Sequence, residues 1–243
     1  MSFPIDIVHQ DPHLLVVNKP AGIATTSPGG KECLVSRVRE ADATAPLLHP
    51  VSRLDAQVSG LVTVARTRQA NRALREAREA GVYRRLYLGL ALRAPDPPEG
   101  SWEAAIATDP RDPRRRVAKL GEGGRSRNHA RPAATDYRTE RVVRQAALLH
   151  LWPRTGRTHQ LRVHCSLAGA PLLGDRHYGG PVRLVLPDGR VLRARRVMLH
   201  CARLVLPDLV RSGELLVAAR PPDDMVALWR DLGGGSLSVP ESA

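Results

Sequence analysis

Several features common in other protein classes are missing from this chain of 243 residues. No apolar run approaches the ~18 residues of a membrane-spanning helix, and the first residues lack the basic and long apolar segments of a signal peptide. The three cysteines are widely spaced and outside any ligand pattern, which argues against a disulfide framework and predicts reduced thiols in a cytoplasmic protein. Because aromatic residues make up only 3%, a nucleic-acid platform of many stacked rings is not expected.

Common catalytic signatures are absent as well. The sequence contains no Gly-x-Ser-x-Gly, Ser-x-x-Lys or Gly-x-x-x-x-Gly-Lys segment, so the usual hydrolase and nucleotide-binding functions have no support. His159 and His164 are five residues apart, which places them on different faces of a helix, and no Cys-x-x-Cys pair occurs. We therefore predict no metal site.

Positive charge, by contrast, is abundant. The formal net charge is +13, and much of the surplus falls in two segments, residues 66–93 and 111–131. Arginine side chains match the geometry of phosphate oxygens, so a polyanion is the expected partner. A solvated charged face would explain either segment alone, but a surplus of this size favours nucleic acid.

Hydrophobic spacing and capping residues predict the order of the structural elements. Thr67 is the expected N-cap of a helix ending at Ala80, and Thr158 that of a helix ending at Ala168. Strands are expected at 5–8, 14–18, 61–65, 83–92, 135–143, 147–152, 197–206 and 214–219, further helices at 33–40 and from 223, and loops at 94–100 and 109–132. Mostly strand-to-strand connections with a few helices predict an α+β fold with one mixed or mostly antiparallel sheet. We expect a single domain over residues 1–233 and a disordered tail over 234–243.

Asp55 is the first candidate for chemistry. It lies in a turn beside Arg53, between Pro50 and Gly60, directly before the strand-like segment 61–65. A partly buried carboxylate must be paired with a cation to stay ionised, and such a carboxylate can act as a nucleophile. The plainer interpretation is an aspartate in a turn next to an arginine, and this motif alone does not exclude it.

The second candidate is the polar segment 154–164, at a predicted junction between a turn and a helix. The free N–H groups of a helix N-terminus suit an anion such as a phosphate or a carboxylate. His159 and Arg162 are three residues apart and share a helix face, and the apolar residues between the polar ones indicate at least half burial. A buried arginine requires a carboxylate, for which Asp55 is a candidate. An arginine-rich surface helix is the alternative.

Several short motifs follow one another in a fixed order along the chain. Around Asp55 the sequence reads Ser52-Arg53-Leu54-Asp55-x-x-x-Ser59-Gly60, and further motifs occur at 11–22, 85–89, 135–137, 154–164, 169–171, 174–179 and 199–204. The first motif resembles the nucleophile motif of RNA pseudouridine synthases of the RluA type. The other motifs resemble those of the same family, in the same order, over nearly the whole chain.

The resemblance implies a pseudouridine synthase fold with an active-site cleft across the sheet. It implies a reaction that breaks the C1′–N1 bond of a uridine, rotates the uracil and rejoins it through C5, without metal or organic cofactor. Asp55 would be the nucleophile. Tyr87, which its apolar strand alone would assign to the core, would stack beside the uracil, and Arg162 would pair with Asp55 and with the substrate backbone.

The resemblance and the basic segments together predict how RNA is held. Arg53 would help to displace the target uridine from its stack. The small N-terminal RNA-binding domain of many relatives has no room before the catalytic region, so we expect the basic segments to take over part of its role. The expected partner is ribosomal or transfer RNA, bound by a monomer through Arg53, Arg154, Arg157, His159, Gln160, Arg114, Arg115 and Arg116.

Two departures and two alternative functions accompany this prediction. The family usually carries histidine and threonine where this chain has Ser52 and Val58, and the change bears on local hydrogen bonding and substrate choice rather than on the reaction class. A non-catalytic RNA-binding or ribosome-assembly factor on the same scaffold is one alternative, although Asp55, Tyr87 and Arg162 are intact. A metal-dependent RNA hydrolase is the other.

Overall fold

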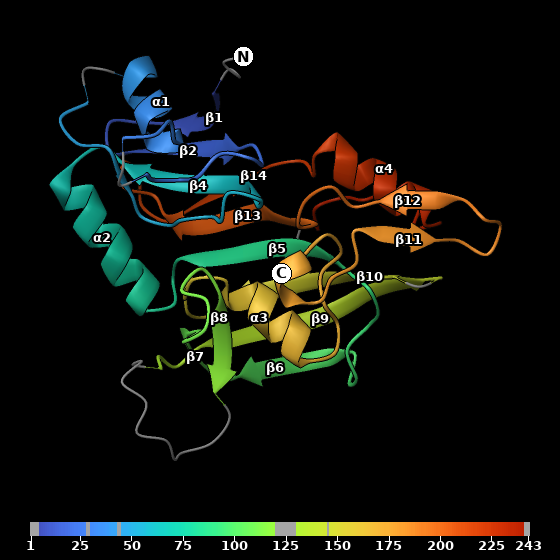
Figure 1. Ribbon diagram of the computed structural model, residues 1–243. Coiled ribbons are helices and arrows are strands. Elements are labelled where there is room, and N and C mark those ends of the chain that lie inside the picture. The colour runs from blue at the N-terminus through green and yellow to red at the C-terminus, as the bar shows by residue number, and fades with distance from the viewer. Residues whose placement is uncertain (1–4, 28–29, 43–44, 120–129, 145, 241–243) are drawn as a thin grey trace. The chain divides into compact units, whose positions relative to one another are not determined.

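The computed structural model describes residues 5–27, 30–42, 45–119, 130–144 and 146–240. Contacts within the chain divide it into two compact units, and Figure 1 labels most of their elements. Unit 1 comprises residues 1–86, 200–222 and 238–243, and unit 2 comprises residues 87–199 and 223–237. A single catalytic domain over residues 1–233 therefore stays a prediction.

Unit 1 is built on a mixed sheet with two helices. It contains β1 (Asp6–Gln10), β2 (Leu14–Lys19), α1 (Leu34–Ala41), β3 (His49–Pro50), β4 (Ser59–Ala65), α2 (Arg68–Glu79), most of β13 (Leu199–Pro207) and β14 (Glu214–Ala218). The pairs β1–β2, β2–β4, β3–β4 and β13–β14 are antiparallel, whereas β4 and β13 run parallel. The sheet is thus mixed but mostly antiparallel, as predicted.

In unit 1, the sequence pattern of the central strands β2 and β4 and of helix α2 matches their burial and capping. Residues 14–17 of β2 and every residue of β4 are buried, which explains their nearly continuous apolar sequences. Thr67 caps α2 by accepting a hydrogen bond from the Ala70 N–H at 3.1 Å, and the helix ends before Gly81, which has a φ of +75°. The α2 boundaries predicted from the caps are confirmed.

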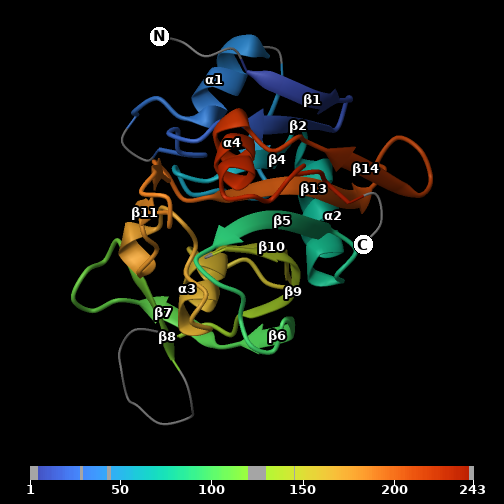
Figure 2. The same cartoon turned by 90° about the vertical axis from the view of Figure 1, so that its right-hand side faces the viewer.

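The strand pairs of unit 2 are antiparallel. The unit contains β5 (Arg84–Ala91, from Tyr87 on), β6 (Glu99–Glu103), β7 (Ala105–Thr108), β8 (Arg116–Lys119), β9 (Ala134–Val143), β10 (Ala146–Pro153), α3 (Gln160–Leu167), the short 3₁₀ helix η1 (Arg176–Tyr178), β11 (Arg183–Val185), β12 (Val191–Arg193) and α4 (Asp223–Asp231). The strands β5, β10, β9 and β6 lie side by side in that order, and β7–β8 and β11–β12 are separate hairpins. Helix α3 packs on β8 and β10 (Figure 2). In the described part of the chain, no helix has the length and hydropathy needed to cross a membrane.

Two strands occur where the sequence predicts loops. Strand β6 falls partly in the segment 94–100, and β8 in the segment 109–132. Within the part of the chain that the structure describes, β6 pairs with β9 on one side only. Four of its five residues are exposed, so its sequence carries no apolar alternation. Among the described residues, β8 pairs with β7 alone. The loop predictions for these residues were wrong, because an edge strand is held by backbone hydrogen bonds that leave little trace in side-chain pattern.

The C-terminal residues, predicted to form a disordered tail over 234–243, make contacts where the structure describes them. The Gly234 N–H donates to the Trp229 carbonyl at 2.9 Å, and Leu237 is buried. Within unit 1, Arg203 donates from Nη1 to the Pro240 carbonyl at 2.8 Å. Residues 241–243 lie outside the described residues.

The start of β4 lies against β13 at very short range. Ser59 and Gly60 pair with His200 and Cys201, and the buried Ser59 Oγ is 3.0 Å from His200 Nδ1. Gly60 has a φ of +114°, and a Cβ at this position would overlap the backbone of Cys201. Only glycine fits here, so this contact sets where β4 begins after the loop that carries Asp55.

Replacing Gly60 with alanine should lower the free energy of unfolding by more than about 2 kcal/mol, because the φ angle and the overlap with β13 are both unfavourable. Urea denaturation measures the change. Gly81→Ala is the matched control, since Gly81 also has a positive φ but its Cβ would meet nothing within 4 Å. The control should lose only about 1 kcal/mol. Equal losses in the two variants would contradict the close approach.

Candidate active site

Asp55 lies in a loop of unit 1 whose backbone is fastened on both sides. Thr25, which is 2% exposed, accepts the Leu54 N–H at 3.0 Å and donates its hydroxyl to the Leu54 carbonyl at 2.9 Å. The Val58 N–H donates to the Asp55 carbonyl at 3.0 Å, which closes the turn that leads into β4. Asp55 itself is half-buried. The loop therefore presents a partly accessible carboxylate on a fixed backbone.

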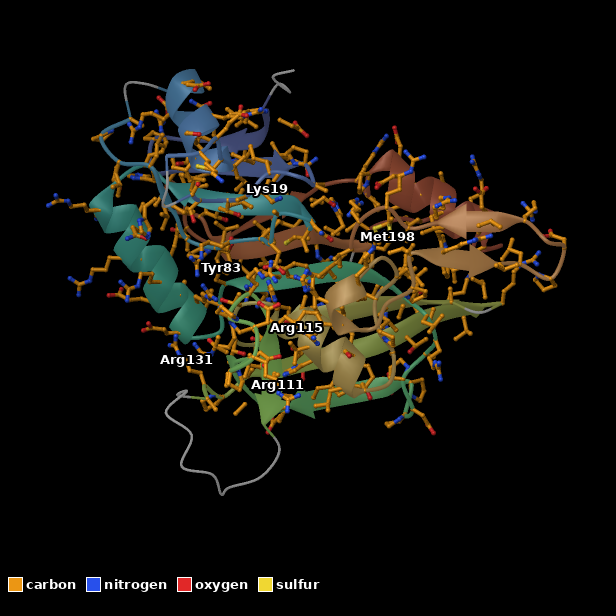
Figure 3. The ribbon with its side chains drawn as sticks, viewed as in Figure 1. Lys19, Tyr83, Arg111, Arg115, Arg131 and Met198 are labelled. Carbon is orange, nitrogen blue, oxygen red and sulfur yellow. The ribbon has the colours of Figure 1, made fainter. Side chains whose placement is uncertain are left out.

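The next residue of this loop, Ala56, is held by the end of β2. Lys19, labelled in Figure 3, is fully buried, and its Nζ donates to the carbonyls of Pro20 at 2.8 Å, Ile23 at 2.8 Å and Ala56 at 3.4 Å. The Ala56 carbonyl also accepts the Gly22 N–H at 2.7 Å. Because a buried ammonium group must be surrounded by acceptors, Lys19 ties the turn after β2 to the loop around Ala56.

Ser52, which departs from the family pattern, is buried before the same loop. The Tyr83 hydroxyl is 3.5 Å from Ser52 Oγ and 2.9 Å from Thr63 Oγ1. Burial raises the pKa of Tyr83, so the phenol keeps its proton and serves as a hydrogen-bond donor. Arg53, between Ser52 and the fastened Leu54, has an exposed side chain.

In unit 2, Arg162 has a carboxylate partner, Asp175. Its Nε donates to Oδ2 at 2.7 Å and its Nη2 to Oδ1 at 2.8 Å, with Arg162 only 5% exposed and Asp175 fully buried. This bidentate pair sets the plane of the guanidinium group. Asp175 meets the need of a buried arginine for a carboxylate, and the pairing of Arg162 with Asp55 stays a prediction.

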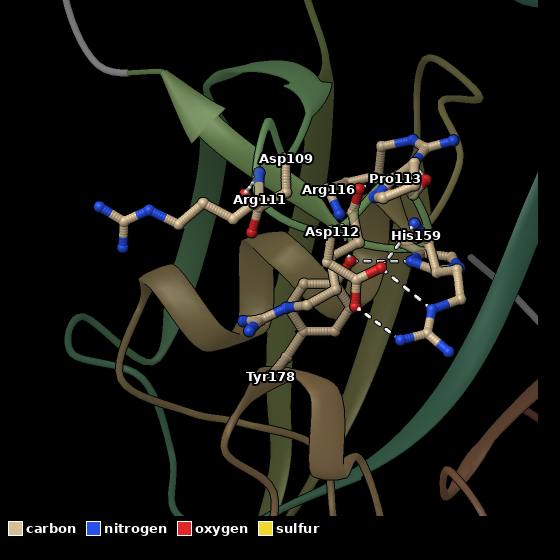
Figure 4. Close-up of polar contacts among 9 residues, drawn as sticks. Asp109, Arg111, Asp112, Pro113, Arg116, His159 and Tyr178 are labelled. Atoms are coloured by element: carbon tan, nitrogen blue, oxygen red, sulfur yellow. Dashed lines mark hydrogen bonds and ion pairs between the residues drawn. The ribbon is translucent and has the colours of Figure 1, made fainter.

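Tyr178 connects the start of α3 with the basic loop, residues 109–116, which leads from β7 into β8, as the close-up in Figure 4 shows. Its hydroxyl is 2.8 Å from His159 Nδ1 and accepts the Arg116 N–H at 2.8 Å. The guanidinium carbons of Arg162 and Arg115 lie 4.9 Å and 5.7 Å from the centroid of its ring, within cation–π range. Two basic segments that the sequence singled out separately therefore meet at one tyrosine.

The basic loop is shaped by its own aspartates (Figure 4). Asp112 accepts from Arg114 Nε at 3.0 Å and Nη2 at 3.3 Å, and Asp109 accepts the Arg111 N–H at 2.9 Å. The hydrogen bond from Arg114 lowers the pKa of Asp112. The side chains of Arg111 and Arg114 are exposed. Of the predicted cluster 111–131, residues 120–129 with Arg125 and Arg127 lie outside the described residues.

Gln160 holds the turn that precedes α3. Its Nε2 donates to the Ala134 carbonyl at 2.9 Å and to Thr135 Oγ1 at 3.0 Å, and its Oε1 accepts from Thr155 Oγ1 at 2.7 Å and from the Arg157 N–H at 2.9 Å. These four bonds use both donors and both lone pairs of the amide. Gln160 therefore shapes the turn, and a direct substrate contact from it stays a prediction.

Arg154 and Arg157 lie in the same turn but in different electrostatic surroundings. Arg154, whose side chain is 49% exposed, pairs with Glu103 at 3.0 Å and with Asp136 at 3.3 Å. Exposed pairs of this kind are weak, so they would exchange readily for another anion. For Arg157, burial and then the neighbouring charge of Arg131 lower the pKa of the guanidinium group.

Helix α3 begins later than its sequence predicts. Thr158, the expected N-cap, is exposed in a turn, and the N-cap position is taken by His159, whose side chain makes no capping hydrogen bond. His159 has a φ of +57°, a left-handed conformation that costs a non-glycine residue about 1–2 kcal/mol. The hydrogen bond to Tyr178 helps to hold it there. Such conformations concentrate at functional sites.

The predicted residues are thus distributed over both units. Arg53 and Asp55 share a loop of unit 1, whereas His159, Arg162, Arg115 and Arg116 gather around Tyr178 in unit 2, with Arg154 and Arg157 in the adjoining turn. Tyr87 lies on β5, is buried, and faces Leu151 of β10 across the strand pair. The geometry in each unit leaves the predicted roles of these residues as proposals.

Four residues with evident structural roles had no function assigned from sequence. Thr25 gave no local signal. Lys19, at the end of an apolar strand and one of only three lysines, was a visible anomaly. Asp175 and Tyr178 both lie in the motif at 174–179, one of the series of short motifs along the chain. The motif marks Asp175 and Tyr178 as candidate functional residues, but it does not indicate which residues they contact.

The sequence profile of a family described as RNA pseudouridylate synthase matches residues 13–167. The chain belongs to this family. It is 31% identical to RNA pseudouridine synthase 2, chloroplastic, of Oryza sativa subsp. japonica, over 95% of this chain and 65% of the rice protein. It is 35% identical to ribosomal large subunit pseudouridine synthase D of Xylella fastidiosa, over 93% and 69% of the two chains. It is 34% identical to dual-specificity RNA pseudouridine synthase RluA of Escherichia coli K12, over 82% of this chain and 85% of that protein.

Solved structures agree with this family membership. Human RNA pseudouridylate synthase domain containing 4 superposes with a TM-score of 0.73 at 25% identity, over 94% of this chain and 93% of that one. Human RNA pseudouridylate synthase domain containing 1 shares the fold, with a TM-score of 0.67 at 24% identity over 96% of both chains. The predicted pseudouridine synthase fold is confirmed. Within the described residues of this family member, His, Cys, Asp and Glu side chains form no group of three or more that could hold a metal ion.

Replacing Thr25 with valine should loosen the Asp55 loop of this family member. The variant keeps the volume but leaves the Leu54 N–H and carbonyl without the hydroxyl, so the free energy of unfolding should fall by about 1–3 kcal/mol. Hydrogen exchange at the Leu54 amide should accelerate. The control is Thr63→Val, which also removes a buried hydroxyl of unit 1 but spares Leu54. Unchanged exchange in the Thr25 variant would show that the hydroxyl does not hold the loop.

Proposed function

We propose that this protein isomerises specific uridines in structured RNA, ribosomal or transfer, to pseudouridine, with Asp55 as the nucleophile. One observation carries the proposal: a half-buried carboxylate stands on a loop with hydrogen-bonded backbone on both sides, in a chain of the RNA pseudouridylate synthase family. The bacterial relatives are named as pseudouridine synthases of the large ribosomal subunit or of dual RNA specificity, which supports RNA as the substrate class.

The reaction needs no second substrate, because it is an isomerisation. The C1′–N1 bond breaks, the uracil turns, and a C1′–C5 bond forms, while the proton lost from C5 is balanced by one gained at N1. A carboxylate nucleophile must reach a nucleotide that has left its stack, which costs a few kcal/mol. A half-buried Asp55 on a fixed loop is accessible to such a nucleotide and is already positioned for it.

Tyr87 and Arg162 complete the surroundings of the uracil in this proposal. Tyr87 stacks beside the extruded base and assists proton transfer, and Arg162 pairs with Asp55 and with the substrate backbone. The contact with Asp175 supports the role of Arg162, because it occupies Nε and one Nη2 donor and fixes the plane of the group. A guanidinium has five N–H donors, so this contact is compatible with further ones.

Phosphate contacts offset the free energy needed to extrude the uridine. Arg53 is exposed on the catalytic loop and displaces the base from its stack. The remaining contacts come from the surface around Tyr178, where Gln160 acts by positioning the turn. The residues proposed to contact RNA phosphates are Arg154, Arg157, His159, Arg114, Arg115 and Arg116.

We also propose that the protein is a monomer of the cytoplasm. Its three cysteines are free and buried, which suits a reducing compartment. Sedimentation equilibrium tests the oligomeric state.

Replacing Asp55 with alanine or asparagine should abolish pseudouridine formation, since neither side chain is a carboxylate nucleophile. The measurement is liquid chromatography with mass spectrometry of nucleosides from RNA of cells lacking the gene, incubated with the purified variant; the chromatography is needed because pseudouridine and uridine have the same mass. RNA affinity should change little, because Asp55 makes no phosphate contact in the proposal. Pseudouridine formed by the alanine variant would refute the mechanism. An inactive wild-type protein that binds RNA would favour the non-catalytic RNA-binding alternative.

Replacing Arg114, Arg115 and Arg116 together with alanine should weaken RNA binding across sequences and reduce the salt dependence of affinity by roughly one unit of slope for each lost phosphate contact. Fluorescence anisotropy with a labelled RNA hairpin over a range of KCl concentrations measures both. The matched control replaces three exposed arginines of the β11–β12 hairpin, which changes the net charge equally; they are Arg183, Arg190 and Arg193. An equal slope for both triple variants would assign the loop arginines to general charge alone.

A further inference from the structure

Tyr178 lies outside the residues to which the reaction assigns a role, yet two basic segments converge on it. We propose that Tyr178 is a positioning residue, which holds the basic loop against the start of α3 so that both segments bind RNA phosphates as one surface. This inference rests on the proposed function in taking RNA as the ligand.

The phenol hydroxyl is the link between the two segments. It accepts the backbone N–H of Arg116 at 2.8 Å and lies 2.8 Å from His159 Nδ1 (Figure 4). A phenol that accepts from one group and donates to the other uses both functions of its oxygen. The bond to Arg116 is made by the backbone, so it places the loop itself and leaves the arginine side chain for other partners.

Two arginine side chains lie near the ring of Tyr178. Arg115 and Arg162 lie within cation–π distance of the ring, and its negative faces reduce the repulsion between two nearby guanidinium groups. Asp175 balances the charge of Arg162. Arg115 differs, because its Nε is buried without a hydrogen-bond partner among the described residues. An outside anion does not reach this buried atom, so a phosphate would bind Arg115 through the N–H groups of its Nη atoms.

Tyr178 can act as a fixed point because its own segment is tight. The Tyr178 N–H donates to the Asp175 carbonyl at 3.1 Å, and the Gly180 N–H donates to the same carbonyl at 2.8 Å. A Cβ on Gly174 or Gly180 would overlap neighbouring backbone, so the chain has no room to shift. One short segment therefore places both the carboxylate that orients Arg162 and the phenol that holds the basic loop.

If Tyr178 were only a core residue, a different result would be expected. Its hydroxyl would contribute to stability and have no specific effect on RNA binding. A positioning role predicts that loss of the hydroxyl lowers RNA affinity through Arg115 and Arg116, without an effect on the chemical step. Tyr178→Phe separates the two, because it removes the hydrogen bonds and keeps the ring.

The experiment compares Tyr178→Phe with the wild-type chain, using a fluorescein-labelled RNA hairpin in a KCl titration and total RNA from cells lacking the gene as substrate. Affinity should fall by about threefold to tenfold, and the slope of log affinity against log salt should fall by about one to two units. The apparent KM should rise by the same factor with kcat unchanged.

Tyr137→Phe is the matched control. Tyr137 is an equally buried tyrosine of unit 2, on β9, and its hydroxyl donates to the Pro97 carbonyl at 3.0 Å. This control should lose a similar amount of thermal stability with no change in RNA affinity or salt slope. Tyr178→Phe is also added to a variant carrying Arg115→Ala and Arg116→Ala, where it should have no further effect on the slope.

Three outcomes decide the matter. A wild-type salt slope in Tyr178→Phe overturns the inference, and so does an additive loss in the triple variant. A reduced slope in Tyr178→Phe supports it if adding Tyr178→Phe to the Arg115→Ala, Arg116→Ala variant reduces the slope no further. If the wild-type chain binds the hairpin but forms no pseudouridine, the proposed function is wrong. The role of Tyr178 in RNA binding is then still decided by the binding data.

Discussion

The buried ion pair between Arg162 and Asp175 is the interaction on which the candidate RNA-binding surface of unit 2 depends. Taking both charges out of water is costly, and two short hydrogen bonds in bidentate geometry offset that penalty. The pair contributes less to net stability than to position, because a lone charge left in that place would be strongly unfavourable. Asp175 also belongs to the tight segment that carries Tyr178, so the same constraint places the phenol, His159 and the basic loop.

Unit 1 holds its candidate nucleophile in a different way. The loop around Asp55 is fastened through neutral backbone groups, by the hydroxyl of Thr25 and by the Lys19 ammonium acting on carbonyls. These contacts fall on the residues before and after Asp55, so the position of the loop is set by its neighbours' backbone. The two units thus use opposite means: charge pairing orients the arginine, and backbone hydrogen bonds orient the loop of the acid.

Sequence reasoning succeeded where the physical cause is local. The cap at Thr67, the glycine after α2 and the apolar strands β2 and β4 each depend on neighbours within a few residues, and the structure confirms them. It failed at β6 and at the start of α3. Strand β6 is an edge strand held by backbone pairing with β9, and the left-handed backbone of His159 depends on contacts with a residue far along the chain.

The sequence by itself determined the α+β class, the order of most elements, the basic character and the family, because periodicity, capping and motif order are written in consecutive residues. It also identified the carboxylate and the arginines on which the chemistry is proposed to depend. Only the tertiary structure decided that Arg162 pairs with Asp175, that Lys19 and Thr25 hold the Asp55 loop, and that two basic segments meet at Tyr178. Those contacts join residues distant in the chain, and their geometry follows from packing, which no local pattern encodes.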